Sequence, residues 1–599
     1  MVARSADPGG DRNGETGKWI AIEGAGELRG DGPHAVSAGG VDLVLLRVGG
    51  GLRAYQGRCP HQGALLGEGE IEGSTLVCRN HRWRFDVETG KRQGGDQCLR
   101  ACPVRQEGGA VLVDTTALTR AEAAPASPLR TLKDLPGPRG LPFVGNALQL
   151  EAGRNHINME DWAAEYGPLY TFRFGPLTAL VVSDPDLTEP LYRARPDTYR
   201  RPSRIELIFQ ELGLAGVFSA EGEAWRAQRR LAMEALSQRN LRGFYPTLER
   251  VTRRLLRRWG EAADTGRELD VSDELKRFTI DVTTLLVFGH DLNTLEKGSE
   301  DVIQRRLEYL FPAIERRLNS VVAYWRYFRL PQDRRVDGAV RDIYAWLSSI
   351  IDQARATLAS DPSRAAKPAN FIEAMLAARD AEGKPFSNDV IFGNGLTMLL
   401  AGEDTTAYTL AWAMHHICDC ASAADGLRRE ADEILGDAPV PADIDRASRL
   451  TYALAVANEA MRLRPIAPTA PFEPVRDVVI GDVAVPKGTT IFALSRAATR
   501  DAARFDSPME FMPERWTRAE VEGKPHDAAV HVPFGSGPRM CPGRALALLE
   551  MRIVLATVYR HFDVQRVGAS ADVREVLAFT MAPAGLRVKL RRRQAPSAT

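Results

Sequence analysis

The stretch Phe534–Gly543, with the sequence FGSGPRMCPG, places Cys541 in a glycine-rich turn directly before the helical pattern 544–560. A thiolate near the start of a helix is stabilised by free backbone N–H groups and by the positive end of the helix dipole. Pro542 is favoured at a first helical position, and the glycines allow the backbone to approach the sulfur and a bound group closely. The stretch therefore predicts a cysteine thiolate that binds a metal at the start of a helix.

A second set of metal ligands lies near the N-terminus, in Cys59-Pro60-His61 and, after sixteen residues, in Cys78-Arg79-Asn80-His81. Neutral imidazoles in place of two thiolates on one iron of a [2Fe–2S] cluster remove negative charge and raise its reduction potential. Two Cys and two His are also a zinc set, but zinc fingers group Cys with Cys and His with His. We therefore favour a Rieske-type iron–sulfur site over a zinc site.

The composition of the 599-residue chain is that of an ordinary globular protein, with 44% hydrophobic and 26% charged residues. Lys+Arg and Asp+Glu are both 78, so no net field favours nucleic acid or an anionic membrane as a partner. Residues 1–18 lack the apolar core of a secretory signal. No run of about 18 apolar residues could span a membrane. We expect a cytoplasmic protein without a membrane span.

Seven cysteines in a long chain without a secretory signal favour metal chemistry in a reducing compartment over a disulfide framework. We interpret Cys98, Cys102, Cys418 and Cys420 as structural residues. No glycine-rich phosphate-binding motif stands between a strand and a helix. We therefore expect no flavin or nicotinamide domain within the chain.

The pattern of the chain predicts two domains of different class. Residues 18–117 contain short alternating apolar runs separated by glycines, which is typical of a small all-β domain. Residues 118–134 have the composition of a linker, and residues 135–592 are dominated by helical periodicity, with minor β-sheets. The helical segments are expected at 225–240, 246–260, 340–358, 388–420, 450–463 and 541–560.

Residues 18–117 resemble the Rieske ferredoxin family on the two ligand motifs, in the segments 59–64 (CPHQGA) and 78–86 (CRNHRWRFD). High-potential members of the family join the two loops by a disulfide, whereas the corresponding positions here are Ala64 and Asn80. The resemblance therefore implies a low-potential cluster that donates electrons. The implied ligands of this [2Fe–2S] cluster are Cys59, His61, Cys78 and His81.

Residues 135–592 resemble the cytochrome P-450 family across nearly their full length, on the stretch 534–543 and on four further motifs in the family's order. Two of these motifs join Glu459 and Arg462, at i and i+3 on one helical face, to Arg515 in a structural ion cluster. The resemblance implies haem b with Cys541 as its axial ligand. The residues implied to contact the haem or shape its loop are Phe534, Gly535, Gly537, Arg539, Gly543, Trp225 and Arg229. Arg539 is placed for a charge-assisted bond to a haem propionate.

The fourth motif, Ala401–Thr406 (AGEDTT), lies within an apolar helical pattern, so its helix is expected to be buried. Buried Asp404 and Thr405 need polar partners, and a threonine can bond back to the preceding turn and bend the helix. The resemblance implies an opening beside O2, with Thr405 hydrogen-bonded to the iron–oxygen unit and Asp404 relaying protons. Ordinary local helix strain is the alternative interpretation.

These features together predict a haem-thiolate monooxygenase with its own Rieske electron donor. A separate NAD(P)H-dependent ferredoxin reductase would reduce the cluster, which would pass single electrons to the haem bound by Cys541. One oxygen atom of O2 would enter a C–H or C=C bond of a lipophilic small molecule. The expected lining segments are apolar with scattered aromatic residues: 199–220, 305–330, 393–405, 465–474 and 579–586.

Three alternatives differ in chemistry. The same haem could serve C–C cleavage or desaturation. A non-enzymatic redox or gas sensor is disfavoured by the Asp404-Thr405 pair and by the lack of a recognisable output domain. A non-haem Rieske oxygenase would need two His and a carboxylate on one iron. His526 and His531 imitate part of that spacing, but Gly523 stands where the upstream Asp is expected.

Overall fold

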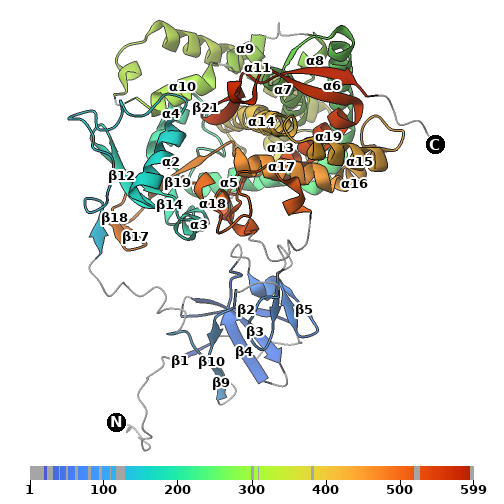
Figure 1. Cartoon of the computed structure of the whole chain (residues 1–599). Helices are drawn as coiled ribbons and strands as arrows, with labels where there is room; N and C mark the ends of the chain where they lie inside the picture. The colour runs from blue at the N-terminus through green and yellow to red at the C-terminus, as the bar shows by residue number, and fades with distance from the viewer. Residues whose placement is uncertain are drawn as a thin grey trace, which may run out of the picture. The chain divides into compact units, whose positions relative to one another are not determined.

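The structure is a computed structural model that describes residues 19–22, 32–39, 41–48, 51–60, 65–78, 83–93, 97–107, 110–116, 129–297, 302–307, 309–320, 322–379, 383–517 and 526–593. The chain forms two compact units, Met1–Leu129 and Arg130–Thr599. The described strands of the first unit form three small antiparallel sheets (Figure 1). In sheet order they are β1 (Trp19–Ala21), β10 (Ala110–Asp114) and β9 (Val104–Glu107); β2 (His34–Ala38), β3 (Val41–Val48), β4 (Gly51–Gln56) and β8 (Ala101–Cys102); and β5 (Glu70–Glu72), β6 (Thr75–Val77) and β7 (Arg84–Asp86).

Strand β3 separates two apolar clusters of the first unit. Successive side chains of a strand point to opposite faces. Leu43 and Leu45 accordingly enter one cluster, whereas Val44 and Leu46 enter the other. All four are buried. The second cluster also contains the two cysteines of the predicted iron–sulfur motifs, so the sheet that β3 belongs to supports that site.

The second unit is mainly helical, and α14 lies in its middle (Figure 1). Its helices are α2 (Asn155–Tyr166), α3 (Pro185–Arg193), α4 (Ser203–Glu211), α5 (Gly222–Ala235), α6 (Gln238–Thr265), α7 (Val271–Phe288), α8 (Thr294–Lys297), α9 (Val302–Leu307), α10 (Leu310–Leu318), α11 (Pro331–Ser360), α12 (Ser363–Ala366), α13 (Phe371–Ala377), α14 (Asn388–Ile417), α15 (Ala421–Leu435), α16 (Ile444–Ser448), α17 (Thr451–Leu463), α18 (Arg496–Thr499) and α19 (Arg544–His561). The predicted fold class, a small β domain followed by a large mainly α domain with minor sheets, is confirmed.

Small sheets frame the helices of the second unit. The largest has the order β12 (Leu169–Phe174), β13 (Leu177–Val182), β19 (Thr490–Leu494), β16 (Thr469–Pro474) and β14 (Tyr199–Arg200). The others are β11 (Arg130–Thr131), β18 (Val483–Val485) and β17 (Val478–Ile480); β15 (Leu269–Asp270), β23 (Arg587–Arg592) and β20 (Phe562–Val567); and β21 (Arg574–Ala578) with β22 (Thr580–Ala584).

Helix α14 carries the predicted proton-relay motif through the core. Ser387 caps its start by accepting a hydrogen bond from the Val390 N–H. The helix packs against α7, α17 and α19. A helix that is apolar on all sides must be buried, and most of the side chains of α14 are buried. Among the helices of the described residues, none combines the length and the apolar character needed to cross a membrane.

Several predicted helix limits are wrong. The helix expected at 340–358 begins earlier, since α11 spans Pro331–Ser360. The segment 225–240 is not one helix, because α5 ends at Ala235 and α6 begins at Gln238. Ser237 stands between them as an N-cap that accepts a hydrogen bond from the Asn240 N–H, a signal that the periodicity obscured. Helix α6 then runs through Pro246, although proline usually ends a helix, so it begins well before residue 246.

Part of the segment assigned to the linker is ordered with the second unit. Arg130 and Thr131 form strand β11, which pairs in parallel with Val483 and Ala484 of β18. Arg130 also forms an ion pair with Asp482 at 2.7 Å. A two-residue strand is too short to show a periodic pattern, so it could not be predicted from the sequence. The domain limits as a whole stay a prediction.

Candidate haem, iron–sulfur and substrate sites

Backbone hydrogen bonds build the Cys541 loop. The Cys541 N–H donates to the Phe534 carbonyl at 2.9 Å and closes the loop between them. Helix α19 begins at Arg544, with Gly543 at its N-cap. The expectation that Pro542 occupies the first helical position is therefore wrong. Residues 541–543 lie ahead of the helix, and the N–H groups of Gly543 and Arg544 lie close enough to the sulfur to favour its thiolate form.

The environment of the sulfur fits a metal-bound thiolate. Burial has the largest influence on Cys541 and raises the pKa of its thiol. The N–H groups of Gly543 and Arg544 and the guanidinium of Arg229 act in the opposite direction without outweighing burial. A metal cation deprotonates a thiol that coordinates it, even where burial disfavours the free thiolate. The hydrogen-bond donors around Cys541 then stabilise the anionic sulfur.

Gly537 lets the loop pass close to the end of α3. Its backbone has a φ of 68°, a conformation that side chains other than glycine rarely adopt. A Cβ atom at this position would lie 2.8 Å from the Tyr192 carbonyl oxygen and 2.9 Å from the Arg193 Cα. Both requirements exclude any other residue without a shift of the backbone. The predicted role of Gly537 in shaping the loop thus has a steric basis.

Three guanidinium groups, those of Arg195, Arg201 and Arg539, gather near the Cys541 loop. Burial lowers the pKa of each, and Arg195 and Arg539 lower the pKa of Arg201 further by repulsion. Glu221 is the carboxylate that acts on all three. The Nε and Nη2 atoms of Arg195 and the Nε and Nη1 atoms of Arg539 are buried without a hydrogen-bond partner among the described residues. This surplus of buried charge and unused donors fits the two carboxylates of a haem.

Trp225 and Arg229 lie beside this cluster on α5. The Arg539 guanidinium carbon is 4.2 Å from the centre of the Trp225 ring, a cation–π arrangement. Arg229 donates a hydrogen bond to the Met540 carbonyl, one residue before Cys541. The structure thus brings Trp225, Arg229 and Arg539 to the wall of one cavity. Their contacts with haem stay predictions.

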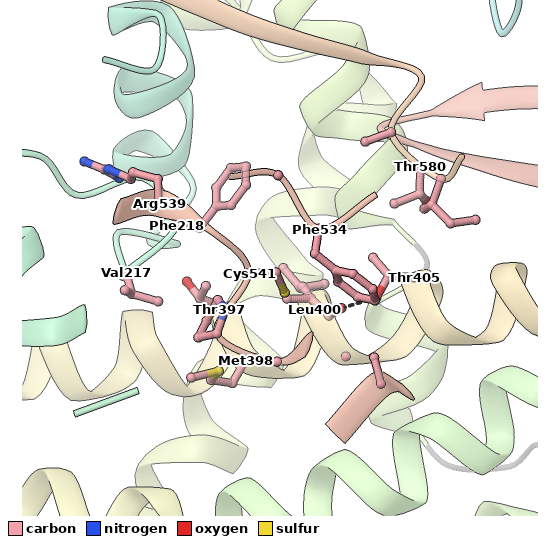
Figure 2. Close-up of a pocket in the computed structure, with 18 of the residues that line it drawn as sticks. Val217, Phe218, Thr397, Met398, Leu400, Thr405, Phe534, Arg539, Cys541 and Thr580 are labelled. Atoms are coloured by element: carbon pink, nitrogen blue, oxygen red, sulfur yellow. Dashed lines mark hydrogen bonds between the residues drawn. The ribbon is translucent and has the colours of Figure 1, made fainter. Parts of the chain in front are cut away.

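One large cavity, of about 1810 Å³, reaches the Cys541 loop, α14 and an apolar wall. Figure 2 shows Phe534 and Cys541 from the loop together with Thr397, Met398 and Thr405 from α14 around it. All five predicted lining segments contribute residues to the cavity. A volume of this size has room for a flat prosthetic group and a small-molecule ligand together.

Four of the phenylalanines that line the cavity form a cluster. Phe579 is their centre, with ring centroids 5.4 Å from Phe311, 5.7 Å from Phe218 and 6.1 Å from Phe209. Phe579 has a φ of 72°, which is uncommon for a residue with a side chain. It stands at the turn between β21 and β22. Strained backbone of this kind clusters at ligand sites.

Asp404 and Thr405 occupy neighbouring positions on α14 but face different surroundings. Helix α14 runs unbroken through the motif, and the Thr405 hydroxyl donates to the Ala401 carbonyl at 2.7 Å, as the sequence predicted. Thr405 lines the cavity. Gly402 lies where α7 crosses, since a Cβ atom there would be 2.5 Å from the Thr283 hydroxyl oxygen. Close helix packing therefore accounts for this glycine.

The Asp404 carboxylate is held by two groups that the sequence motif did not indicate. Lys276 of α7 forms an ion pair with it at 3.1 Å, and the Thr580 hydroxyl lies 3.4 Å from its second oxygen. Burial lowers the pKa of Lys276, but Asp404, Tyr408 and Glu403 together raise it above its ordinary value. Lys276 therefore stays charged at neutral pH. Thr580 also lines the cavity, so its hydroxyl joins Asp404 to that space.

The predicted ion cluster is present and fully buried. Glu459 accepts hydrogen bonds from Arg462 at 2.8 and 2.9 Å and from Arg515 at 3.0 Å. Trp516 Nε1 donates to the same carboxylate at 2.8 Å, and the Met512 N–H does so at 3.0 Å. The cluster therefore ties α17 to the segment before the Cys541 loop.

The predicted iron–sulfur ligands are only partly within the described residues. Cys59 and Cys78 are buried, with 1% and 2% exposure, and both belong to the apolar cluster on one face of β3. His61 and His81 lie outside the described residues. Trp83, two residues after His81, is covered by the Arg92 guanidinium at 3.5 Å. Two buried thiols in one apolar cluster fit the cysteine half of the ligand set.

His526 and His531, which could have suggested a non-haem iron site, pack on Trp516. Their ring centroids are 4.9 and 4.8 Å from the indole. Burial lowers the pKa of His531 to about 3. Among the described residues, no cluster of three or more His, Cys, Asp or Glu side chains has the arrangement of a metal site. Nothing in this arrangement supports the non-haem alternative.

Comparisons with known proteins match a family to each of the two regions of the chain. The cytochrome P-450 family model matches residues 135–590, and the Rieske [2Fe-2S] domain model matches residues 18–104. The LUTEIN DEFICIENT 5 protein of Arabidopsis thaliana is 25% identical over 75% of this chain and 76% of its own length. The mitochondrial 25-hydroxyvitamin D-1 alpha hydroxylase of Rattus norvegicus is 27% identical over 76% of this chain and 93% of its own length. A self-sufficient monooxygenase of Penicillium expansum is 25% identical over 79% of this chain but only 44% of its own length.

Proposed function

We propose a specific reaction for this chain on the premise that it belongs to the cytochrome P-450 family and is a haem-thiolate monooxygenase with a Rieske [2Fe–2S] domain. The proposed reaction is hydroxylation or epoxidation of a lipophilic small molecule with O2. Electrons come from a separate NAD(P)H-dependent ferredoxin reductase and enter through the Rieske cluster. The observation that carries this proposal is the cavity that joins the Cys541 loop, the Thr405 hydroxyl and an aromatic wall.

Cys541 would hold the haem iron through its thiolate, and Arg195, Arg201 and Arg539 would pair with the haem carboxylates. When bound, a haem with a thiolate ligand supplies the activation of O2 for insertion into an organic substrate. The N–H groups of Gly543 and Arg544 hold the sulfur in place. The Arg539 guanidinium carbon lies 4.2 Å from the centre of the Trp225 ring, which helps to hold it. The loop and the arginine cluster would thus hold the group together.

The cavity wall selects the substrate by polarity. Phe209, Phe218, Phe311 and Phe579 bring four aromatic rings together, so an apolar ligand loses water-exposed surface when it binds there. Two aromatics of the predicted segments have other roles. Phe472 packs in a separate core with Tyr192 and Tyr199, and Tyr324 packs on Trp325.

Thr405 and Asp404 are the proposed proton carriers. The Thr405 hydroxyl donates a hydrogen bond to the Ala401 carbonyl, and by rotating it can donate instead into the cavity that Thr405 lines. Asp404 is paired with Lys276, and Thr580 links its carboxylate to the same cavity. The Asp404–Lys276 pair is therefore placed to pass a proton through a hydroxyl to the cavity, which general acid catalysis requires.

Thr405→Ala should keep substrate binding but divert most electrons from product to hydrogen peroxide, because the hydroxyl acts in proton delivery and not in binding. The ratio of product to NAD(P)H consumed, measured with the peroxide yield, checks this. Thr405→Ser is the matched control and should largely restore coupling, since it keeps the hydroxyl. An unchanged ratio in Thr405→Ala would remove Thr405 from the proposed relay.

Iron analysis of the purified chain should give two cluster irons for each haem iron and no stoichiometric zinc, because the Rieske domain binds a [2Fe–2S] cluster. Metal analysis together with the electron paramagnetic resonance spectrum of the reduced cluster makes this measurement. His81→Cys should lower the cluster potential where the cluster still assembles, since a thiolate adds negative charge. Stoichiometric zinc without the two additional irons would favour the zinc-finger interpretation.

The reaction class is tested by product analysis with a lipophilic compound library, NAD(P)H, a ferredoxin reductase and isotopically labelled O2. We expect products that carry one labelled oxygen atom. A product that has lost two hydrogens without gaining oxygen, or a cleaved carbon skeleton, would instead identify desaturation or C–C cleavage. NAD(P)H consumption that no compound stimulates would favour a sensor.

A further inference from the structure

Glu315 of α10 lines the cavity beside the phenylalanine cluster of its wall. Phe311, Glu315 and Leu318 all line the cavity, and their spacing of four and three residues places them on one face of the helix. Phe311, one turn before Glu315, stacks on Phe579 with an interplanar angle of 21°. Glu315 is therefore one helical turn from a member of the phenylalanine cluster that lines the cavity.

The charged neighbours of Glu315 are engaged elsewhere. Arg316 forms an ion pair with Asp333 at 3.0 Å. Arg204, which also lines the cavity, donates to the backbone carbonyls of Arg317 and Ser320. Neither guanidinium is thus used to neutralise the Glu315 carboxyl.

Within the described part of the chain, no hydrogen bond or ion pair reaches the Glu315 carboxyl group. Burial is the cause acting on it and raises its pKa to about 7. A half-buried carboxylate without a partner is costly unless a hydrogen-bond donor or a cation joins it. An acid with no structural partner in a ligand cavity is therefore explained better by a ligand than by stability.

We propose that Glu315 determines specificity by binding the protonated amine of an otherwise apolar substrate. The inference rests on the proposed function, since it takes this cavity as the substrate site. An ammonium group neutralises the carboxylate, which a hydroxyl group does not. The faces of the neighbouring aromatic rings also attract a cation electrostatically, and this attraction is much weaker for a neutral hydroxyl group. The substrate class is thus a lipophilic amine whose apolar body lies on the phenylalanine cluster.

Binding of a matched pair of probes to the holoenzyme tests this proposal. The pair is N,N-dimethylphenylbutylamine and the hydrocarbon of the same shape in which a CH group replaces the nitrogen. Isothermal titration is carried out at about pH 8, where Glu315 is mostly ionised and the tertiary amine is still protonated. The unaltered chain should bind the amine at least about tenfold more tightly than the hydrocarbon, the advantage of a charge-assisted contact.

Substitutions at Glu315 separate the charge from the shape of the cavity. Glu315→Gln should weaken amine binding about tenfold or more and leave hydrocarbon binding unchanged. Glu315→Leu should lose the amine in the same way and bind the hydrocarbon more tightly. Glu433→Gln, at an exposed position on α15, is the control and should change neither affinity.

Three outcomes overturn the proposal. They are equal affinities for the two probes, no binding of either, or an amine affinity that Glu315→Gln does not change. A fourth outcome is spectroscopic. If the amine shifts the haem absorption band to that of a nitrogen-ligated iron equally in the unaltered protein and in Glu315→Gln, the amine binds the iron and not Glu315. None of these titrations needs the reductase or O2. Failure of the monooxygenase reaction would therefore be seen separately.

Discussion

Cys541→Ala is expected to abolish both the thiolate-type Soret band of the reduced carbon monoxide complex and product formation. The described loop brings the Cys541 sulfur to the cavity, where the N–H groups of Gly543 and Arg544 favour its thiolate form. The methyl group of an alanine can neither coordinate a metal nor accept a hydrogen bond from these groups. The arginine cluster should still retain part of the haem through its carboxylates. The absorption spectrum of the reduced, carbon monoxide-bound protein makes the measurement.

Cys418→Ala is the matched control for this experiment. Cys418 is also a partly buried thiol of the second unit, just beyond the end of α14. Its Sγ lies 4.0 Å from the Val564 carbonyl oxygen, which is a long contact for a hydrogen bond. Its replacement should leave the Soret band and activity intact. A thiolate-type band that survives in Cys541→Ala would overturn the assignment of the axial ligand.

Glu459→Ala should have the second largest effect, a collapse in the yield and thermal stability of the holoprotein. Burial raises the pKa of Glu459, but Arg462 and Arg515 outweigh it and hold the pKa below its ordinary value, so the carboxylate is ionised in the fold. Removing it leaves two buried guanidinium groups without their anion. Breaking a buried ion pair in this way costs about 3–5 kcal/mol.

The loss of Glu459 is measured as the melting temperature and the haem content of the purified protein. Glu433→Ala removes an exposed glutamate from the neighbouring α15 and should shift neither by a measurable amount. Glu459→Asp keeps the charge but shortens the reach to Arg515 and Trp516, so an intermediate effect is expected. A stable, haem-replete Glu459→Ala protein would show that the cluster is dispensable for folding.

Local motifs made part of the site predictable from sequence. The loop 534–543 and the segment 401–406 are continuous in the chain, so the residue types and their spacing already define which groups meet. Helix α17 was expected at 450–463 and lies at Thr451–Leu463, because it is a single buried helix without internal caps. The three members of the Glu459 cluster were also predicted, and the structure joins them directly.

The residues that sequence patterns missed are those that only the tertiary fold brings together. Arg195 and Arg201 follow α3 in the chain and reach Arg539 because the loop at Gly537 packs on the end of that helix. Lys276 reaches Asp404 because α7 crosses α14. No local spacing could have indicated these pairs. Arginine and lysine side chains on a helix or loop are usually solvated. Arg195, Arg201 and Lys276 differ from that pattern only by their burial, which the sequence does not show.

The central claim is that electrons reach the haem through the Rieske cluster of the same protein. We would reduce the chain anaerobically under carbon monoxide with NAD(P)H and a ferredoxin reductase, and follow the thiolate-type Soret band by stopped flow. The band should form after the cluster is reduced and should be almost absent in Cys78→Ser, which removes a cluster ligand but leaves the haem domain intact. Formation of the band at the same rate in Cys78→Ser would contradict the claim, because the haem would then receive its electrons without the cluster.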